Sequence, residues 1–290
     1  MPLSHFHPVA RDWFASHLGA PTAAQEQAWP AIKAGRHTLI SAPTGSGKTL
    51  AAFYAVIDNL LWEGQRGPLP AATQVLYISP LKALAVDVER NLLSPINEMG
   101  LNIVAESRTG DTGVSRKQWQ KLKPPDMLLT TPEQLALLLA WEGAQGLFED
   151  LSCVIIDEIH TLWPSKRGDL LALGLSRLQT IAPRMRRVGL SATVDDPDLI
   201  RDWLGRETDS VDLVRGPPGP SPVVEVLISG GRVPWAGHTA QHAMGDVYEI
   251  IKRHRTTLIF VNTRRLAERV THQLSELLGP DQVSSHHGSL

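Results

Sequence analysis

The sequence predicts an α/β fold, in which a parallel sheet is covered by helices on both faces and is followed by the start of a second α/β domain. Three observations predict this fold. Short apolar segments alternate with segments whose apolar residues recur at helical spacing. A glycine-rich loop at 42–49 joins one such strand to one such helix. A second apolar strand, at 153–156, runs directly into two carboxylates, Asp157 and Glu158.

The expected elements follow one another along the chain. Residues 1–35 are predicted to be helical, with Phe6, Val9, Trp13 and Phe14 on one face. Strands are expected over 38–41, 74–79, 102–106, 127–130, 153–156 and 185–190, and helices over 50–61, 82–99, 132–141 and 169–181. Ligands of such folds bind at the carboxyl ends of the strands, so the chemistry is expected there.

Residues 215–222, RGPPGPSP, interrupt this alternation. Four prolines and two glycines in eight residues cannot continue a helix or a central strand. We therefore predict a first domain over 1–214, a linker over 215–222 and the start of a second domain over 223–290. The second domain is expected to hold strands at 223–228, 257–261 and near Val283, and helices at 243–254 and 264–278. About three strands are too few to cover a core, which would leave exposed apolar faces on Ile250, Leu258, Phe260 and Leu274.

The composition limits the class of protein. Hydrophobic residues make up 42% and charged residues 20% of the 290 positions, as in soluble globular proteins. The absence of a membrane-spanning run or a signal-peptide core predicts a cytoplasmic protein without a membrane partner. The single cysteine, Cys153, excludes an internal disulfide and is expected to be buried and unreactive, and most of the eight tryptophans are expected to serve packing. The net charge of −2 means that nucleic acid would be bound by local sites.

The loop at 42–49, APTGSGKT, has the residues that bind a nucleoside triphosphate. Glycines at positions 45 and 47 let successive backbone N–H groups converge on phosphate oxygens at the start of a helix. The lysine that follows supplies a positive charge for the β- and γ-phosphates, and the threonine offers a hydroxyl to magnesium. A plain turn is the alternative, which the flanking strand and helix disfavour. The residues expected to hold ATP and Mg²⁺ here are Thr44, Gly45, Ser46, Gly47, Lys48 and Thr49.

Asp157 and Glu158 are expected to complete this site. Two carboxylates at the end of a buried strand are costly unless they meet a cation or a polar site. If their strand lies beside the strand that precedes the loop, Asp157 reaches the magnesium held by Thr49, and Glu158 polarises the attacking water. The alternative is a solvated acidic strand end, which the phosphate-binding loop upstream disfavours.

Further segments occur in an order that resembles the superfamily 2 helicases, and most closely the Lhr (large helicase-related) DEXH family, over essentially the whole chain. The segments that carry the resemblance are PTAAQ (21–25), APTGSGKT (42–49), SPLKALAVD (79–87), RTGDT (108–112), TTPEQL (130–135), DEIH (157–160), KRG (166–168), SAT (191–193), FVNTRR (260–265) and HHGSL (286–290). The resemblance implies RecA-like domains of a P-loop NTPase, the second of them incomplete. It implies that Gln25 reads the adenine, an edge that an amide can pair with as both donor and acceptor.

The resemblance also implies roles for other residues. Catalysis is assigned to Lys48, Asp157, Glu158 and His160, and the coupling of hydrolysis to movement to Ser191 and Thr193. Nucleic-acid contacts are assigned to Lys82, Arg108, Thr131, Thr263, Arg264 and His287. The family's later motifs, including the arginines that complete the ATP site, would lie beyond residue 290. We therefore expect the 290-residue chain to bind ATP but to show little hydrolysis stimulated by nucleic acid.

The function that follows is an ATP-dependent DNA helicase or translocase in DNA repair, acting on single-stranded DNA or a DNA/RNA hybrid, with magnesium as its only metal. An RNA helicase is the first alternative. The second is a nucleic-acid clamp with a vestigial ATP site, which the presence of Lys48, Thr49, Asp157 and Glu158 disfavours. Thr131 has an alternative role of its own, because Thr-Pro-Glu is a good helix start.

We predict that Arg264→Ala lowers the affinity for single strands of unrelated base sequence to a similar extent. Because one phosphate contact would be lost, the slope of log affinity against log salt concentration should become shallower by about one unit. Fluorescence anisotropy of labelled oligonucleotides over a range of salt concentrations measures both quantities. A loss confined to one base sequence would show that Arg264 contacts a base edge instead.

Overall fold

The computed structural model describes residues 2–205, 210–219, 221–228 and 243–286, apart from the side chains of residues 2, 82–84, 86–87 and 90–92. The chain forms two compact units, Met1–Pro220 and Ser221–Leu290. The division lies inside the 215–222 segment, whose role as a linker stays a prediction.

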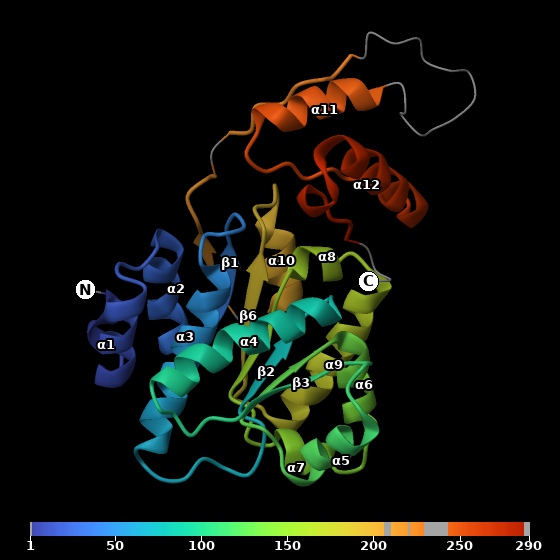
Figure 1. The fold of residues 1–290 in the computed structure, drawn as a ribbon. Helices are drawn as coiled ribbons and strands as arrows, with labels where there is room; N and C mark the ends of the chain where they lie inside the picture. Colours follow the sequence, from blue (N-terminus) through green and yellow to red (C-terminus); the bar gives the residue numbers. More distant parts are fainter. Residues whose placement is uncertain (1, 206–209, 220, 229–242, 287–290) are drawn as a thin grey trace. The chain divides into compact units, whose positions relative to one another are not determined.

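The first unit is built on a seven-stranded sheet in which all neighbouring strands are parallel (Figure 1). The strand order is β3-β4-β2-β5-β6-β1-β7. The strands are β1 (His37–Ser41), β2 (Val75–Ile78), β3 (Ala105–Arg108), β4 (Met127–Thr130), β5 (Cys153–Ile156), β6 (Arg186–Ser191) and β7 (Val211–Arg215). The predicted parallel sheet of an α/β fold is therefore confirmed.

Helices cover both faces of this sheet. They are η1 (Pro2–His5), α1 (Pro8–His17), α2 (Ala23–Lys33), α3 (Lys48–Gly64), α4 (Lys82–Glu98), α5 (Val114–Leu122), α6 (Pro132–Leu139), α7 (Ala144–Phe148), α8 (Ile159–Leu162), α9 (Lys166–Ile181) and α10 (Pro197–Leu204). Alternate strand residues enter two separate cores, because successive side chains of a strand point to opposite faces. Tyr77 and Ile155 pack with α1–α4, whereas Leu76, Ile78 and Ile156 pack with α6–α10.

The sequence prediction misplaced one strand and missed another. The third strand was expected over 102–106 and lies at Ala105–Arg108. At Val104 the carbonyl already accepts from the Met127 N–H at 3.0 Å, but the N–H donates to the Asp126 carboxylate at 2.7 Å, and regular pairing with β4 begins at residue 105. The short strand β7 pairs with β1 at the sheet edge. Its sequence, VDLVR, adjoins the proline-rich segment and has only a weak strand pattern.

The described part of the second unit contains α11 (Met244–Arg253), α12 (Arg264–Leu278) and η3 (Pro280–Gln282). The expected strands at 223–228, 257–261 and near Val283 are wrong for the described residues, which have no ladder hydrogen bonds there. A strand needs a neighbour for its backbone groups, and a local apolar pattern does not supply one. Leu258 and Phe260 are exposed as expected, at 79% and 91%, but Leu274 is buried.

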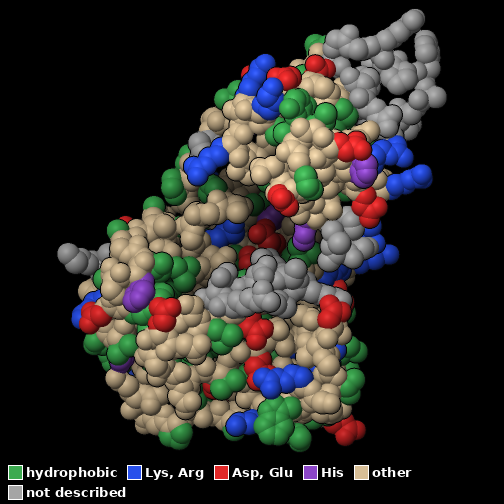
Figure 2. Space-filling model, viewed as in Figure 1, with side chains coloured by type: hydrophobic (Ala, Val, Ile, Leu, Met, Phe, Trp, Pro, Cys, Tyr) green, Lys and Arg blue, Asp and Glu red, His purple; other side chains and the backbone are tan. Residues whose placement is uncertain are grey.

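None of the helices in the described ranges has the length and apolarity needed to cross a bilayer. On the face shown in Figure 2, acidic and basic side chains are interspersed. Most of the described tryptophans pack in or against the two cores, as expected, whereas Trp62 and Trp119 are 39% and 50% exposed.

A buried ion pair attaches the N-terminal helices to α3. The Asp58 side chain is fully buried, and its carboxylate accepts hydrogen bonds from the ammonium of Lys33 on α2 and from the backbone N–H of His7 at 2.6 Å. The Lys33 ammonium also lies 4.6 Å from the centre of the Phe6 ring. The Asp58 carboxylate is 0% exposed and the Lys33 side chain 16% exposed, so the carboxylate depends on these two donors to offset the cost of its burial.

We predict that Asp58→Ala lowers the free energy of unfolding of the protein by about 3–5 kcal/mol, because it leaves the largely buried Lys33 ammonium without its counter-ion and the His7 N–H without its acceptor. Urea denaturation followed by circular dichroism measures the change. The matched control is Asp12→Ala, which removes an exposed carboxylate paired with Arg11 and should stay within about 0.5 kcal/mol of the wild type. Equal effects of the two substitutions would contradict a structural role for the buried pair.

Candidate nucleotide-binding site

The loop between β1 and α3 has the backbone conformation of a phosphate cradle. Gly45 and Gly47 have φ angles of +82° and +80°, which other residues adopt with strain. Ser46 N–H donates to the Pro43 carbonyl at 3.3 Å, and the first bond of α3 runs from Ala51 N–H to the Gly47 carbonyl at 2.9 Å. The N–H groups before Ala51 have no acceptor within the helix and are available to a ligand at its N-terminus.

Two buried polar groups in this loop fit a bound phosphate. The Lys48 side chain starts α3 and is only 5% exposed. The Ser46 hydroxyl is buried and has no hydrogen-bond partner among the described residues. A buried ammonium and a buried hydroxyl without a partner are costly unless an anion approaches them. Of the other loop residues, Thr44 and Gly45 are exposed and Thr49 is half-buried.

The predicted acidic residues lie near this loop, but not on the neighbouring strand. We expected the strand of Asp157, β5, to lie beside β1, the strand that precedes the loop. This expectation is wrong, because β6 lies between β1 and β5. Two steps across a sheet place the strands about 10 Å apart, a distance that a lysine and an aspartate side chain can span together. The Lys48 charge does act on Asp157, where it favours the ionised carboxylate. The ends of β1, β6 and β5 therefore form one site.

Asp157 is 2% exposed and is held from two sides. The Tyr77 hydroxyl donates to its Oδ2 at 2.6 Å, and the Glu158 N–H donates to its Oδ1 at 2.8 Å. Burial raises the pKa of Asp157 above its ordinary value, and the hydrogen bonds and the Lys48 charge oppose that rise. A bound cation beside this carboxylate would favour its ionised form in the same way.

Glu158 and His160 connect this carboxylate pair to the end of β6. Glu158 is the one described residue other than glycine with a positive φ, +46°, and it precedes α8. Its carboxylate lies 3.4 Å from His160 Nε2, while His160 Nδ1 accepts from the Ala192 N–H at 3.3 Å. The second contact places the proton of a neutral imidazole on Nε2, facing Glu158. A strained, non-glycine backbone is typical of functional sites.

The predicted coupling residues take part less directly than expected. The Ser191 hydroxyl donates to the Ala192 carbonyl at 2.8 Å, and Thr193 is exposed. The contact between His160 and the 191–193 segment is therefore made by the Ala192 backbone. The same segment adjoins the loop, because Ala42 N–H donates to the Ser191 carbonyl at 3.1 Å. The coupling roles of Ser191 and Thr193 stay predictions.

Gln25 is buried against the loop. Its Oε1 accepts from the Thr22 N–H at 2.9 Å, and its Nε2 donates to the Gly47 carbonyl at 3.4 Å. A Cβ atom at Gly47 would lie 2.7 Å from that nitrogen, so any other residue there would displace the Gln25 amide in addition to straining the positive φ. One N–H and one lone pair of the Gln25 amide stay unused in these contacts, so adenine recognition stays a prediction.

The predicted nucleic-acid contacts of the first unit are only partly accessible. Arg108 is 6% exposed, and its guanidinium donates to the Lys117 carbonyl at 2.9 Å and to Gln120 Oε1 at 3.3 Å. Burial lowers the pKa of Arg108. This geometry holds α5 against β3, and the nucleic-acid contact of Arg108 stays a prediction. Thr131 is buried at the start of α6, and the side chain of Lys82 lies outside the described residues.

In the second unit, two predicted contacts lie at the start of α12. The Thr263 hydroxyl accepts from the Leu266 N–H at 3.2 Å and caps the helix, and Arg264 is exposed. His287 lies outside the described residues. No three His, Cys, Asp or Glu side chains cluster as metal ligands within the described ranges.

The KRG segment at 166–168 has a structural explanation. Ser165 caps α9, and a Cβ atom at Gly168 would lie 2.2 Å from the Leu162 carbonyl oxygen, so glycine is required for the close contact with α8. Arg167 forms a two-pronged ion pair with Glu133 on α6, at 2.5 and 3.1 Å. This pair connects α9 to the helix that follows Thr131. Neither this pair nor the contact of Tyr77 with Asp157 was predicted, because each joins residues far apart in the sequence.

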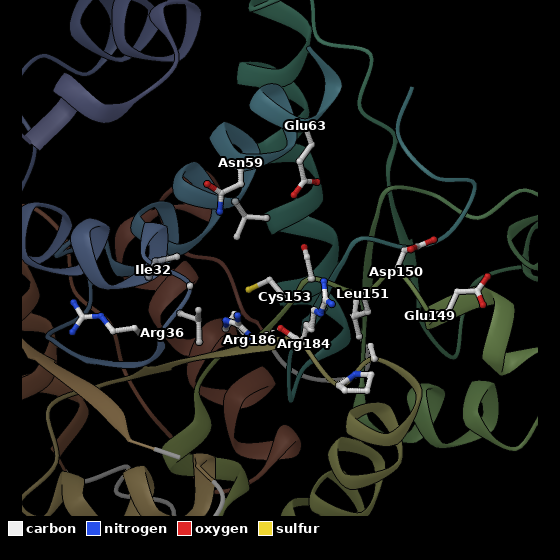
Figure 3. Close-up of a pocket in the computed structure, with 16 residues that line it drawn as sticks. Ile32, Arg36, Asn59, Glu63, Glu149, Asp150, Leu151, Cys153, Arg184 and Arg186 are labelled. Carbon is white, nitrogen blue, oxygen red and sulfur yellow. Dashed lines mark hydrogen bonds between the residues drawn. The ribbon is translucent and has the colours of Figure 1, made fainter. Parts of the chain in front are cut away.

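Figure 3 shows a cavity of about 520 Å³ at the opposite edge of the sheet, near the amino ends of β5 and β6. Its lining carries both signs of charge, from Glu149 and Asp150 to Arg184 and Arg186. It contains none of the predicted nucleotide-binding residues. Cys153 also lines it, and burial raises the pKa of that thiol to about 12, as expected for an unreactive cysteine.

Comparison with known proteins gives the same assignment as the site geometry. Residues 22–200 match the DEAD/DEAH box helicase family. The chain is 40% identical over 294 residues to an Lhr helicase of Mycolicibacterium smegmatis, and 38% identical over 304 residues to the ATP-dependent helicase Lhr-Core protein 2 of Thermococcus barophilus. These alignments cover 95% and 97% of this chain, but only 19% and 35% of the two relatives. A third relative, the Lhr helicase/uracil glycosylase of Escherichia coli, is 37% identical over 303 residues, which are 94% of this chain and 20% of the relative.

Solved structures show the same fold. The Mycobacterium smegmatis helicase Lhr bound to ssDNA and AMP-PNP matches all of this chain and 39% of its own, with a TM-score of 0.81 and 37% identity. The DEAD-box helicase Mss116 bound to ssRNA and UDP-BeF matches 86% of this chain and 51% of its own, with a TM-score of 0.70 and 18% identity. The second likeness shows the fold alone. The predicted RecA-like architecture is confirmed by these neighbours.

We predict that Arg167→Ala raises the pKa of Glu133 from about 2 towards its ordinary value of 4.5, because the hydrogen bonds from Arg167 are the main cause of the low value. Since the pKa is lowered in the folded protein, the pair stabilises the fold above about pH 4.5 and loses this effect as the pH falls towards 2. Carboxyl-carbon NMR titration of Glu133 measures the shift. Arg201→Ala, which breaks the separate pair with Asp198, is the control, and an unchanged pKa in Arg167→Ala would contradict the assigned cause.

Proposed function

The chain belongs to the DEAD/DEAH box helicase family, and from this premise we propose that it is the ATP-binding part of an ATP-dependent helicase or translocase that moves along single-stranded DNA. The chain spans between about a fifth and a third of the curated relatives it matches, so the activity of the whole protein is a proposal. One observation carries it. A glycine-rich cradle, a buried Lys48 and a buried Asp157 meet at the carboxyl edge of one parallel sheet.

The residues at this edge fit ATP with magnesium. The Ser46 hydroxyl, which has no partner among the described residues, the buried Lys48 and the first N–H groups of α3 suit phosphate oxygens. Thr49 and Asp157 are the oxygen donors that would hold the ion. When bound, Mg²⁺ would neutralise negative charge on the β- and γ-phosphates. Few protein ligands are needed, because magnesium keeps several waters and binds the phosphates themselves.

The remaining residues divide the work of hydrolysis and coupling. Glu158 is half-buried beside Asp157, and in this proposal its carboxylate orients the attacking water. His160 contacts both Glu158 and the backbone at the end of β6. A change at the γ-phosphate would therefore reach the 191–193 segment through one imidazole ring. In two-domain motors of this kind, such a change alters how the domains grip the strand.

Single-stranded DNA is the proposed track, with a DNA/RNA hybrid as a further substrate. The support is the M. smegmatis Lhr structure, which is bound to ssDNA and is 37% identical to this chain. The interspersed surface charges favour local contacts to phosphates over a broad basic surface, so low sequence specificity is expected (Figure 2). We also propose a role in DNA repair, since the E. coli relative is named a helicase and uracil glycosylase.

We predict that Lys48→Ala weakens ATP binding, whereas Glu158→Gln keeps ATP binding and abolishes hydrolysis. The lysine contacts phosphate charge, but the glutamate acts only on the water. Binding of a fluorescent ATP analogue to this chain separates the two variants. In the whole protein, Glu158→Gln should lower DNA-stimulated turnover about a hundredfold or more.

The matched control for the glutamate is Glu63→Gln, a neutralisation in the cavity at the opposite edge of the sheet, which should change neither quantity. Equal loss of nucleotide affinity in Lys48→Ala and Glu158→Gln would contradict the assigned roles. Turnover stimulated by RNA but not by single-stranded DNA would favour an RNA helicase.

A further inference from the structure

Tyr77, in the middle of the sheet, makes a contact that the proposed function has not used. The side chain is 1% exposed, and its hydroxyl donates to Asp157 Oδ2 at 2.6 Å. The two residues are 80 positions apart in the sequence. If this side chain served packing alone, a phenylalanine would do as well and would bury no polar group. The buried hydroxyl therefore indicates a role for its hydrogen bond to Asp157.

The strand register brings this hydroxyl within reach of Asp157. Tyr77 of β2 pairs with Ile155 of the neighbouring strand β5. Residues two apart on a strand share a face, so Ile155 and Asp157 point to the same side of the sheet as Tyr77. A tyrosine side chain is long enough to reach one such step further along the strand. The ring is held in this direction by Phe53 of α3, whose centroid lies 5.0 Å away.

The contact fixes the orientation of the carboxylate. Asp157 Oδ1 accepts the Glu158 N–H and Oδ2 accepts the Tyr77 hydroxyl, so both oxygens are anchored. Each carboxylate oxygen accepts more than one hydrogen bond or ligand, so a lone pair on each stays available for a cation. The two donors also offset part of the cost of burying the charge.

We propose that Tyr77 is a positioning residue for magnesium, which holds the Asp157 carboxylate in the orientation that the ion requires. The proposal rests on the proposed function, in which Asp157 is a ligand of the ion. Tyr77 itself does not contact magnesium or nucleotide. Its loss should weaken the binding of the ion while the phosphate cradle stays intact, because partners of metal ligands control how well the ligands are aligned.

The test compares two phenylalanine substitutions. Tyr77→Phe removes the hydroxyl next to Asp157. Tyr54→Phe is the matched control, because Tyr54 is also fully buried and its hydroxyl donates to the Ala10 carbonyl, a group outside the site. Binding of a fluorescent, non-hydrolysable ATP analogue to the 290-residue chain is measured while the magnesium concentration is varied, and again in EDTA.

We expect the magnesium concentration for half-maximal binding to rise about tenfold in Tyr77→Phe. Nucleotide affinity in EDTA should equal that of the wild type, and Tyr54→Phe should keep the wild-type magnesium midpoint. An unchanged midpoint in Tyr77→Phe, in a variant that melts cooperatively, would overturn the proposal. A midpoint that rises equally in both variants would also overturn it, since the cause would then be general loosening of the core.

Two additions keep the test decisive. If Tyr77→Phe does not fold, Tyr77→Met removes the donor while filling the space with an adaptable side chain. In an Asp157→Ala background, Tyr77→Phe should have no further effect on the midpoint, because the residue acts only through that carboxylate. If the wild-type chain binds the nucleotide without any dependence on magnesium, the proposed function fails, and that result is distinct from a failure of the Tyr77 proposal.

Discussion

The in-register pairing of β5, β6 and β1 is the constraint on which the candidate site depends. Ile156 pairs with Gly189, and Ser41 pairs with Ser191, so the residues that follow each strand leave the sheet at the same edge. Because side chains alternate between the faces of a strand, a slip of one residue in β5 would turn Asp157 towards the other core and away from Lys48. Gly189 leaves room for α10 against the sheet, since a Cβ atom there would lie 2.9 Å from the Leu204 side chain. The chemistry of the edge is thus a consequence of how three strands are aligned in the interior.

The same edge gathers groups that are unfavourable in a folded protein. It holds a buried ammonium, a buried carboxylate, a hydroxyl with no partner in the described part of the chain, and a glutamate with left-handed backbone. Each of these lowers stability unless something compensates. Tyr77 and the Glu158 N–H compensate the carboxylate within the protein, whereas the phosphate-facing groups depend on a ligand. Elsewhere in the first unit, the Lys33–Asp58 pair shows the other arrangement, in which both charges are satisfied internally.

The sequence correctly predicted the helices and strands whose ends are determined by neighbouring residues in the chain. The strands at 127–130 and 153–156 and the helix at 264–278 lie at the predicted positions, since apolar runs, Pro132 and the Thr263 cap define their ends. The tight backbone turn of the loop was also predictable, because glycine is the residue that adopts a positive φ without strain. Strand order was not predictable in this way, because the insertion of β6 between β1 and β5 depends on pairing between distant segments. For the same reason the burial of Arg108 under α5 and the contact of Tyr77 with Asp157 carried no signal in the sequence. The strands expected in the second unit failed because an apolar pattern does not by itself supply a pairing partner.

The contacts between α2 and the glycine-rich loop have a mechanical consequence. The Thr22 hydroxyl donates to the Ser46 carbonyl at 2.8 Å, and the Gln25 amide donates to the Gly47 carbonyl, so both carbonyls that point away from the cradle are tied to one helix. That helix is in turn fixed by Trp29, which stacks edge-on to Phe6 and Phe14 and donates to the Ala51 carbonyl of α3. The loop is therefore held in place by α2, and α2 is held in place by an aromatic cluster that lies outside the nucleotide-binding residues. Because the Ser46 and Gly47 carbonyls are both bonded to the start of α2, the position of that helix sets the position of the cradle.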